Sequence, residues 1–141
     1  MTLNMSPFFQ DQCLDRARDV MNDGVVVSNA YIEIYTSPQP SSPVGAPLGM
    51  KLTTFFLPDP AVTGPIGNEL AILMGGLTAV VIADGVASWF RYYNKNGTTL
   101  FDGTVVLNGQ IGDIKLSKVN LINGDNIQIS NAKLQFKCSP S

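Results

Sequence analysis

The chain of 141 residues is long enough for one domain with a single hydrophobic core. Nine basic and eleven acidic residues leave a net charge of −2, so the basic field that attracts nucleic-acid phosphates is missing and we expect no nucleic-acid partner. Charged residues make up 14% of the chain, compared with about 25% in ordinary soluble domains. A surface so poor in charge is either rich in neutral polar residues or covered by neighbouring subunits in an assembly.

The residue types that are absent or rare limit the chemistry further. Histidine is absent, which removes the commonest general base and a common metal ligand. Cys13 and Cys138 lie at opposite ends of the chain without CxxC spacing, and a disulfide between them stays an open alternative. The first residues lack the pattern of a signal peptide, so we expect synthesis and assembly in a cytoplasm. The longest apolar stretch, residues 70–83, is split by two glycines and is shorter than the roughly 20 residues that cross a bilayer, so we expect it in the core and expect no membrane partner.

Residues 1–24 are predicted to form an N-terminal arm and a helix. Ser6 and Pro7 are typical of a helix start, and Gly24 is typical of a helix end. Apolar residues four apart predict the stripe that faces the core. This stripe consists of Phe9, Cys13, Ala17 and Met21, with Val20 beside it. The opposite face carries Asp11, Asp15, Arg16, Arg18 and Asp19. Exposure to solvent is the simplest interpretation of this charged face, and docking of a partner is the alternative.

Residues 25–141 are predicted to form a β-sandwich, because short alternating apolar runs are separated by turn residues. The expected strands span residues 25–27, 31–36, 50–57, 77–83, 87–94, 98–107, 111–116 and 126–130. Asn96 and Gly97 predict a tight hairpin turn. Residues 36–47 and 58–67 are predicted loops, because proline cannot donate to a strand ladder.

The last segment changes phase. Ile127 and Ile129 would lie on one face of a continuous strand. The apolar residues that follow have the opposite parity; they are Ala132, Leu134, Phe136 and Cys138. We therefore expect a bulge or break near Ser130 and Asn131. About eight short strands joined by variable loops favour an all-β, jelly-roll-like two-sheet sandwich with one N-terminal helix.

No catalytic set and no cofactor site is predicted. A hydrolytic site without histidine needs paired carboxylates, a serine with a lysine, or a metal bound by oxygen ligands. The acidic residues of the β region occur singly, mostly at turns and strand ends, where aspartate bonds its own backbone. Calcium is the ion alternative, with Asp102, Asp113 and Asp125 as the residues that would converge, although no spacing resembles an EF-hand. The glycines of residues 67–76 and 109–112 match no phosphate-binding motif.

Residues 87–103 form the densest aromatic segment and the main candidate for a binding site. On an extended strand Trp89, Arg91 and Tyr93 face one side and Phe90 faces the other, so both sides carry large apolar groups. Three interpretations stay open: packing in the core, a protein interface with Trp89 and Arg91 as anchors, and a sugar-binding platform.

Four segments follow one another in a characteristic order: IEIYTSPQP, KLTTFFLPDPAV, LTAVVIADGVASWFRYYNKNGTTLFDGTVV and NGDNIQISNAKLQFK. In this order they resemble a group of small virion proteins of tailed bacteriophages. The similarity covers residues 31–137, and the combination of ASWFR with LFDG is its most distinctive part. Ser37 stands where the group's first turn would have glycine, which affects the expected geometry of that turn.

The resemblance implies a jelly-roll cement or decoration protein, without enzymatic activity, on the outer surface of the virion head. Its partner would be the major capsid protein, whose neighbouring subunits it clamps, and a homo-oligomer, dimer or trimer, would extend each clamp. The expected contact residues are Trp89, Phe90, Arg91 and Tyr93, followed by Tyr31 and Tyr35, with residues 37–47 as the contacting loop. A phage tail or head-fibre component and a carbohydrate-binding module are the alternatives, and an enzyme is the third.

Overall fold

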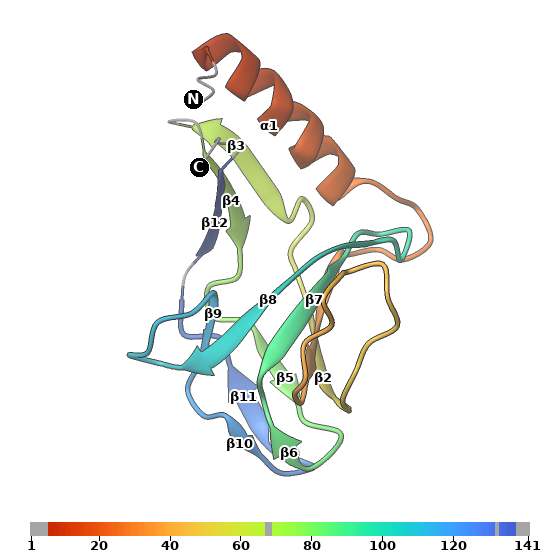
Figure 1. Ribbon diagram of the computed structural model, residues 1–141, viewed down its shortest axis with the longest axis vertical. Coiled ribbons are helices and arrows are strands. Elements are labelled where there is room, and N and C mark those ends of the chain that lie inside the picture. The colour runs from red at the N-terminus through yellow and green to blue at the C-terminus, as the bar shows by residue number, and fades with distance from the viewer. Residues whose placement is uncertain (1–5, 67–68, 132, 138–141) are drawn as a thin grey trace.

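The computed structural model describes residues 6–66, 69–131 and 133–137. Strands dominate this part of the chain and form a sandwich-like all-β fold with one helix, as predicted (Figure 1). The more specific jelly-roll arrangement stays a prediction. The elements are α1 (Pro7–Asn22), β1 (Tyr31–Tyr35), β2 (Lys51–Phe56), β3 (Val62–Ile66), β4 (Glu69–Leu73), β5 (Thr78–Val80), β6 (Gly85–Val86), β7 (Trp89–Tyr93), β8 (Thr99–Leu107), β9 (Ile114–Leu116), β10 (Asn120–Leu121), β11 (Asn126–Gln128) and β12 (Lys133–Lys137).

Helix α1 starts where the sequence predicts and packs through part of the predicted stripe, since Ala17 and Met21 contact the core together with Leu14. The Ser6 hydroxyl accepts a hydrogen bond from the Phe9 amide at 3.2 Å, which caps the first turn. Leu14 and Met21 are buried, Cys13 is half-buried and Phe9 is exposed, so the prediction that Phe9 faces the core is wrong. Repeated steps of four residues rotate around the helix by about 40° each, whereas alternating steps of three and four stay on one side.

The helix lies along β3 and is bound to it through side chains. The Asn22 side-chain amide donates to the Val62 carbonyl and accepts from the Val62 amide, both at 3.0 Å. Arg18 donates to the Gly64 carbonyl at 2.6 Å. Arg18 was predicted to lie on the solvent-facing side, and it instead fixes the helix to the sheet.

The largest sheet has the strand order β2-β1-β7-β8-β9. Its neighbours are antiparallel, except that β8 and β9 are parallel. The predicted hairpin joins β7 to β8, with its turn centred one residue earlier than expected, on Lys95 and Asn96. The Gly97 amide donates to the Asn94 carbonyl at 2.9 Å, and Gly97 has a φ of 76°, a conformation that glycine adopts without strain.

Two short ladders close the sandwich at the lower end of the molecule (Figure 1). In these ladders β11 pairs with β5 and β10 pairs with β6. The Ile82 amide donates to the Leu52 carbonyl of β2 at 2.8 Å, and the Ser130 amide donates to the Lys115 carbonyl of β9 at 2.7 Å. Both edge strands of the largest sheet therefore have further hydrogen-bond partners, which limits edge-to-edge pairing with other chains.

A second sheet with the order β12-β4-β3 lies beside α1 (Figure 1). Its strand β3 falls in a segment that we predicted to be a loop because of its prolines. Pro65 lies where the register between β3 and β4 shifts, between Thr63 and Ile66. Proline is tolerated at such an irregularity because no regular ladder bond needs its missing N–H group.

The predicted interruption near Ser130 is present. Strand β11 ends at Gln128, and β12 begins at Lys133 and pairs with β4 in the other sheet. The change of sequence phase therefore marks the point where the chain passes from one sheet to the other. Ala132 and Cys138, two members of the second apolar set, lie outside the described residues.

Several strand boundaries differ from prediction. Residues 25–27 form no strand, and Val25 is exposed. Residues 69–73 form β4, a strand that the sequence analysis does not predict. No helix within the described part of the chain is long and apolar enough to cross a membrane.

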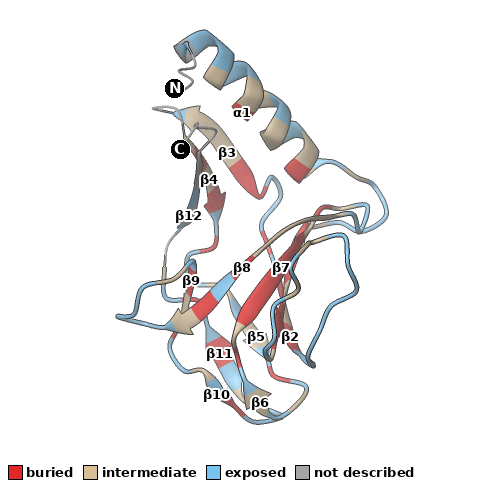
Figure 2. Ribbon diagram, viewed as in Figure 1, coloured by how far each residue is buried: buried red, intermediate tan, exposed pale blue. Residues whose placement is uncertain are grey.

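The hydrophobic core extends through both sheets. Buried residues line the strands in the middle of the molecule and continue below the helix (Figure 2). Leu14 of α1, Ile72 of β4, Phe90 of β7 and Ile127 of β11 belong to one cluster. The side of the largest sheet that faces this cluster is called the inner face below.

Candidate protein-binding surface

The opposite side of the largest sheet, called the outer face here, carries five of the six predicted contact residues, all except Phe90. The two strands are in register, so their outer-face residues form three cross-strand pairs. These pairs are Tyr31 with Tyr93, Glu33 with Arg91, and Tyr35 with Trp89. The pairing follows from strand alternation, which places residues of one parity on one face.

At one end of the outer face, Tyr35 and Trp89 stack with their ring centroids 4.5 Å apart. The Trp89 indole nitrogen donates to the Thr36 carbonyl at 2.7 Å, and the Arg91 guanidinium lies 5.3 Å from the Trp89 ring. The Tyr35 hydroxyl donates to Glu33 at 2.8 Å. Burial, together with hydrogen bonds to Tyr93 and Glu33, raises the pKa of Tyr35 well above its usual value.

Arg91 connects this end of the sheet to the proline-rich loop, which we define as residues 36–50. Its Nε and Nη2 atoms donate to the two carboxylate oxygens of Asp102 at 2.6 and 2.9 Å. Its Nη1 atom donates to the Gly45 carbonyl at 2.7 Å, with a longer contact of 3.4 Å from Nη2 to the Ser42 carbonyl. The hydrogen bond to Asp102 raises the pKa of Arg91. A guanidinium satisfied by a bidentate partner and a backbone carbonyl can remain charged although it is buried.

The loop therefore covers residues that we expected at the surface. Trp89 is 0% exposed, and Phe90 and Arg91 are each 1% exposed, so the prediction that these three side chains contact a partner directly is wrong. Tyr35 is buried as well. Trp89 and Phe90 pack in the core, as the first of the three interpretations predicted, and Arg91 is buried beside them. The sugar-binding alternative also loses its platform, because it needed an accessible Trp89.

Phe90 belongs to the inner face, where its position depends on Gly103. The rings of Phe90 and Phe101 meet edge to face with centroids 6.1 Å apart. A Cβ atom at Gly103 would overlap the Phe90 ring. Glycine is therefore required opposite Phe90 for the ring to reach the core.

The other end of the outer face is open. Tyr31 and Tyr93 stack with centroids 4.8 Å apart and an interplanar angle of 11°. Phe56 of β2 lies 5.9 Å from Tyr31 and is 62% exposed. Tyr31 and Tyr93 are half-buried, and burial raises the pKa of both. Of the six predicted contact residues, these two tyrosines keep accessible surface on the outer face.

The proline-rich loop itself presents apolar groups to solvent. It has no charged residue, and all of residues 44–50 are exposed. Its three large apolar side chains are Val44, Leu48 and Met50, and Val44 is 88% exposed. Phe56 and Leu48 are large exposed side chains of this surface that the sequence analysis missed, whereas Val44 lies in the predicted contacting loop, residues 37–47. For Leu48, the available signal was an apolar residue in a segment without charge.

The calcium alternative finds no support in the geometry. Asp102 binds Arg91, the Asp113 carboxylate accepts from the Thr104 amide at 2.9 Å, and Asp125 pairs with Lys118 at 2.6 Å. The hydrogen bond from Lys118 lowers the pKa of Asp125. Within the described ranges no three metal-binding side chains gather at one place.

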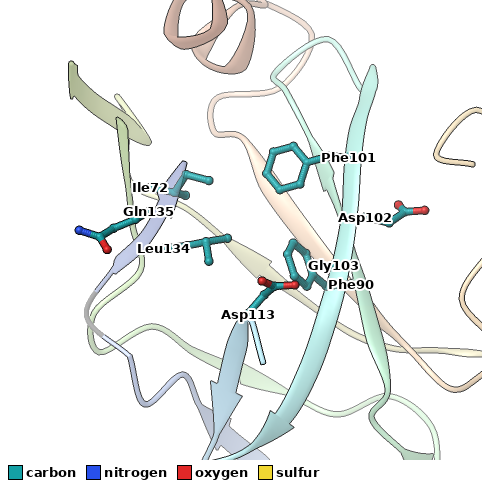
Figure 3. Close-up of a pocket in the computed structure, with 8 residues that line it drawn as sticks. All are labelled: Ile72, Phe90, Phe101, Asp102, Gly103, Asp113, Leu134 and Gln135. Atoms are coloured by element: carbon teal, nitrogen blue, oxygen red, sulfur yellow. The ribbon is translucent and has the colours of Figure 1, made fainter. Parts of the chain in front are cut away.

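A small cavity of about 140 Å³ lies between the two sheets (Figure 3). Apolar groups make up most of its wall, namely Ile72, Phe90, Phe101 and Leu134, with Gly103, Gln135, Asp102 and Asp113 at its margin. Figure 3 shows Asp102 directed to the opposite side of β8 from Asp113. The Asp102 carboxylate therefore lies on the side of β8 where it binds Arg91, away from the Asp113 carboxylate.

The alternative of a disulfide between Cys13 and Cys138 stays open, because Cys138 lies outside the described residues.

No protein-family model, curated protein or solved structure matches this chain.

Proposed function

We propose that this chain is a non-enzymatic structural protein of a tailed-phage virion, a decoration or cement protein that binds the outer surface of the head. Its partner is the major capsid protein. The observation that carries the proposal is the proline-rich loop, an uncharged and exposed apolar segment that buried side chains of the sheet bind through its backbone. The resemblance of residues 31–137 to small virion proteins gives the class of assembly.

The way in which the loop is bound supports a role in recognition. Trp89 and Arg91 donate hydrogen bonds to backbone carbonyl groups of the loop, those of Thr36, Ser42 and Gly45. The apolar side chains of residues 44–50 are left exposed to solvent. Four prolines restrict the backbone further. A loop that is already ordered loses little conformational entropy when a partner binds it.

The loop and the open end of the outer face belong to the same side of the largest sheet. The loop leaves β1 after Tyr35 and returns at Lys51 of β2, the strand that also carries Phe56. The loop and the open end of the outer face together present apolar surface with little charge. Such a surface suits a protein interface whose affinity comes from buried area. A standard interface buries about 1,600 Å² in total, and repetition over a symmetric shell strengthens contacts that are weak individually.

Binding is expected to follow the final arrangement of the shell. Only then do neighbouring capsid subunits have the spacing that one clamp can bridge, and a ligand that binds one state stabilises that state by mass action. A dimer or trimer of this chain about a symmetry axis would extend the clamp.

The test is to mix the purified protein with expanded empty heads of the phage whose genome encodes it and to image the particles. Extra density on the outer surface is the expected result. A double variant, Val44→Asp with Leu48→Asp, should lower occupancy at least about tenfold, because each charge would lose its water in an apolar contact. Ile111→Asp is the matched control, since Ile111 is 100% exposed and its loop lies on the opposite side of the molecule in Figure 1.

Three outcomes overturn the proposal. Bare heads in the presence of folded protein would do so, and binding to tails instead of heads would favour the tail or fibre alternative. Equal loss of occupancy in the double variant and in the control would show that the proline-rich loop is not the contact.

A further inference from the structure

We propose that Asn108 is a site of covalent self-modification, at which the chain converts this asparagine to aspartate and isoaspartate. The inference does not depend on the proposed function. The backbone nitrogen of Gly109 attacks Cγ of the Asn108 side chain and forms a C–N bond. The bond between Cγ and the side-chain nitrogen breaks, and this nitrogen leaves as ammonia. Water then opens the cyclic imide at either carbonyl. The balance is loss of ammonia and gain of water, with no oxidant or reductant.

The chain contains three Asn-Gly dipeptides in exposed turns, at residues 96–97, 108–109 and 123–124. Glycine favours this reaction because its nitrogen is not shielded by a Cβ atom. All three glycines have positive φ, at 76°, 95° and 95° in chain order. Sequence, exposure and local conformation therefore do not distinguish the three sites, and their hydrogen bonds do.

The reacting groups of Asn96 and Gly97 are both occupied. The Gly97 amide donates to the Asn94 carbonyl at 2.9 Å, and the Asn96 side-chain oxygen accepts from the Val25 amide at 3.1 Å. The attack needs the glycine nitrogen without its proton and a rotated asparagine side chain. Both hydrogen bonds must break before the Gly97 nitrogen can reach Cγ of Asn96.

Asn123 and Gly124 are held in a comparable way. The Gly124 amide donates to the Val81 carbonyl at 2.8 Å. The Asn123 amide donates to the Asp84 carboxylate at 2.7 Å, which fixes the backbone on the other side of the dipeptide. The attacking nitrogen is therefore unavailable unless the turn opens.

Asn108 and Gly109 lack these restraints. No described residue hydrogen-bonds the Asn108 side chain or the Gly109 amide. Hydrogen bonds hold the turn on either side of this dipeptide: the Asn108 amide donates to the Leu116 carbonyl, and the Gln110 amide donates to the Leu107 carbonyl.

The surroundings of the turn leave room for the reaction. Apart from the two neighbouring residues, no atom lies within 4 Å of a Cβ position at Gly109, so the space beside this glycine is open. The turn projects from the side of the sandwich between β8 and β9 (Figure 1). Ile111 beside it is fully exposed, so water reaches the imide freely.

The product changes the character of this turn. Residues 107–112 carry no charge, and either product adds one carboxylate. The isoaspartate form also lengthens the backbone by one carbon. The turn joins the parallel pair β8 and β9 at the margin of the sheet, so the fold itself should tolerate both products.

The experiment is to incubate the folded protein at mildly alkaline pH and to follow the three dipeptides by peptide mass spectrometry with fragment sequencing. The modified peptide is heavier by about 1 Da. Asn108 should convert about two- to tenfold faster than Asn96 or Asn123, the factor expected from one net hydrogen bond. Enzymatic methylation of isoaspartate should label the same site.

Two controls test whether the folded turn sets the rate at Asn108. Gly109→Ala should slow conversion at residue 108 without affecting the other two sites, and in urea the three rates should become similar. Conversion of Asn96 or Asn123 as fast as Asn108 in the folded protein would overturn the proposal. So would an unmodified Asn108 under conditions in which the unfolded chain reacts.

Discussion

Strands β1 and β7 carry two stacked aromatic pairs on the outer face, one at each end of the same ladder. Tyr35 and Trp89 stack at 4.5 Å, and Tyr31 and Tyr93 stack at 4.8 Å. The proline-rich loop covers the pair of Tyr35 and Trp89, which is buried. The pair of Tyr31 and Tyr93 lies beside the exposed Phe56. Both pairs consist of aromatic residues on the same two strands and the same face. The difference in their burial therefore comes from the proline-rich loop, which covers only one of them.

The largest effect is expected where the covered end depends on a buried charge. Arg91→Met leaves the Asp102 carboxylate buried without its partner and frees the Gly45 carbonyl, which should lower the free energy of unfolding by about 3–5 kcal/mol. Urea unfolding followed by Trp89 fluorescence measures it, and proteolysis within residues 36–50 should accelerate. The ion pair of the exposed Lys51 with Glu33 gives the control, since Lys51→Met should cost less than about 1 kcal/mol. Equal losses would mean that Arg91 does not hold the loop.

The next effect concerns Gly49, near the end of the proline-rich loop. Gly49 has a φ of 82°, and a Cβ atom there would overlap the carbonyl oxygen of Thr36. Gly49→Ala should destabilise the protein by about 2–4 kcal/mol, since backbone strain and overlap add. Gly76 has a φ of 74° and open space around its Cβ position, so Gly76→Ala should cost only about 1–2 kcal/mol for the conformation alone. Thermal unfolding of both variants tests the difference, and a smaller loss for Gly49→Ala would contradict it.

A smaller effect should appear at alkaline pH. The pKa of Tyr35 is raised in the folded state, so the unfolded chain loses this proton first. The stabilisation is complete below the unfolded pKa of about 10 and decreases as pH rises above it. Tyr35→Phe should therefore flatten the alkaline decline in the urea midpoint. At neutral pH it should cost about 1–2 kcal/mol, since the bond to Glu33 is lost. An unchanged alkaline slope would show that Tyr35 does not titrate as expected.

The smallest effect on stability is expected at the open end. Phe56→Ser should change the free energy of unfolding by no more than about 0.5 kcal/mol, because the side chain is largely exposed already. Binding to heads should nevertheless weaken. Chemical unfolding and a head-binding assay on the same sample separate the two effects. A variant that binds normally would remove Phe56 from the proposed surface.

Local sequence signals predicted much of the fold. The serine cap of α1, the hairpin before Gly97 and the phase change near Ser130 all depend on neighbouring residues, and all three are present. Strand β3 was missed because its proline lies at a register shift, a feature of strand pairing that the sequence of one segment does not contain.

The sequence by itself determined the all-β class and the parity of residues 89–93, because alternation along a strand is a local property. Only the tertiary structure decided which side of that strand is accessible. The bonds that cover Trp89 and Arg91 come from Thr36 and Gly45, 53 and 46 residues away along the chain. Aromatic residues suit a buried face and a binding face equally well, and the difference depends on where a distant loop closes over the sheet.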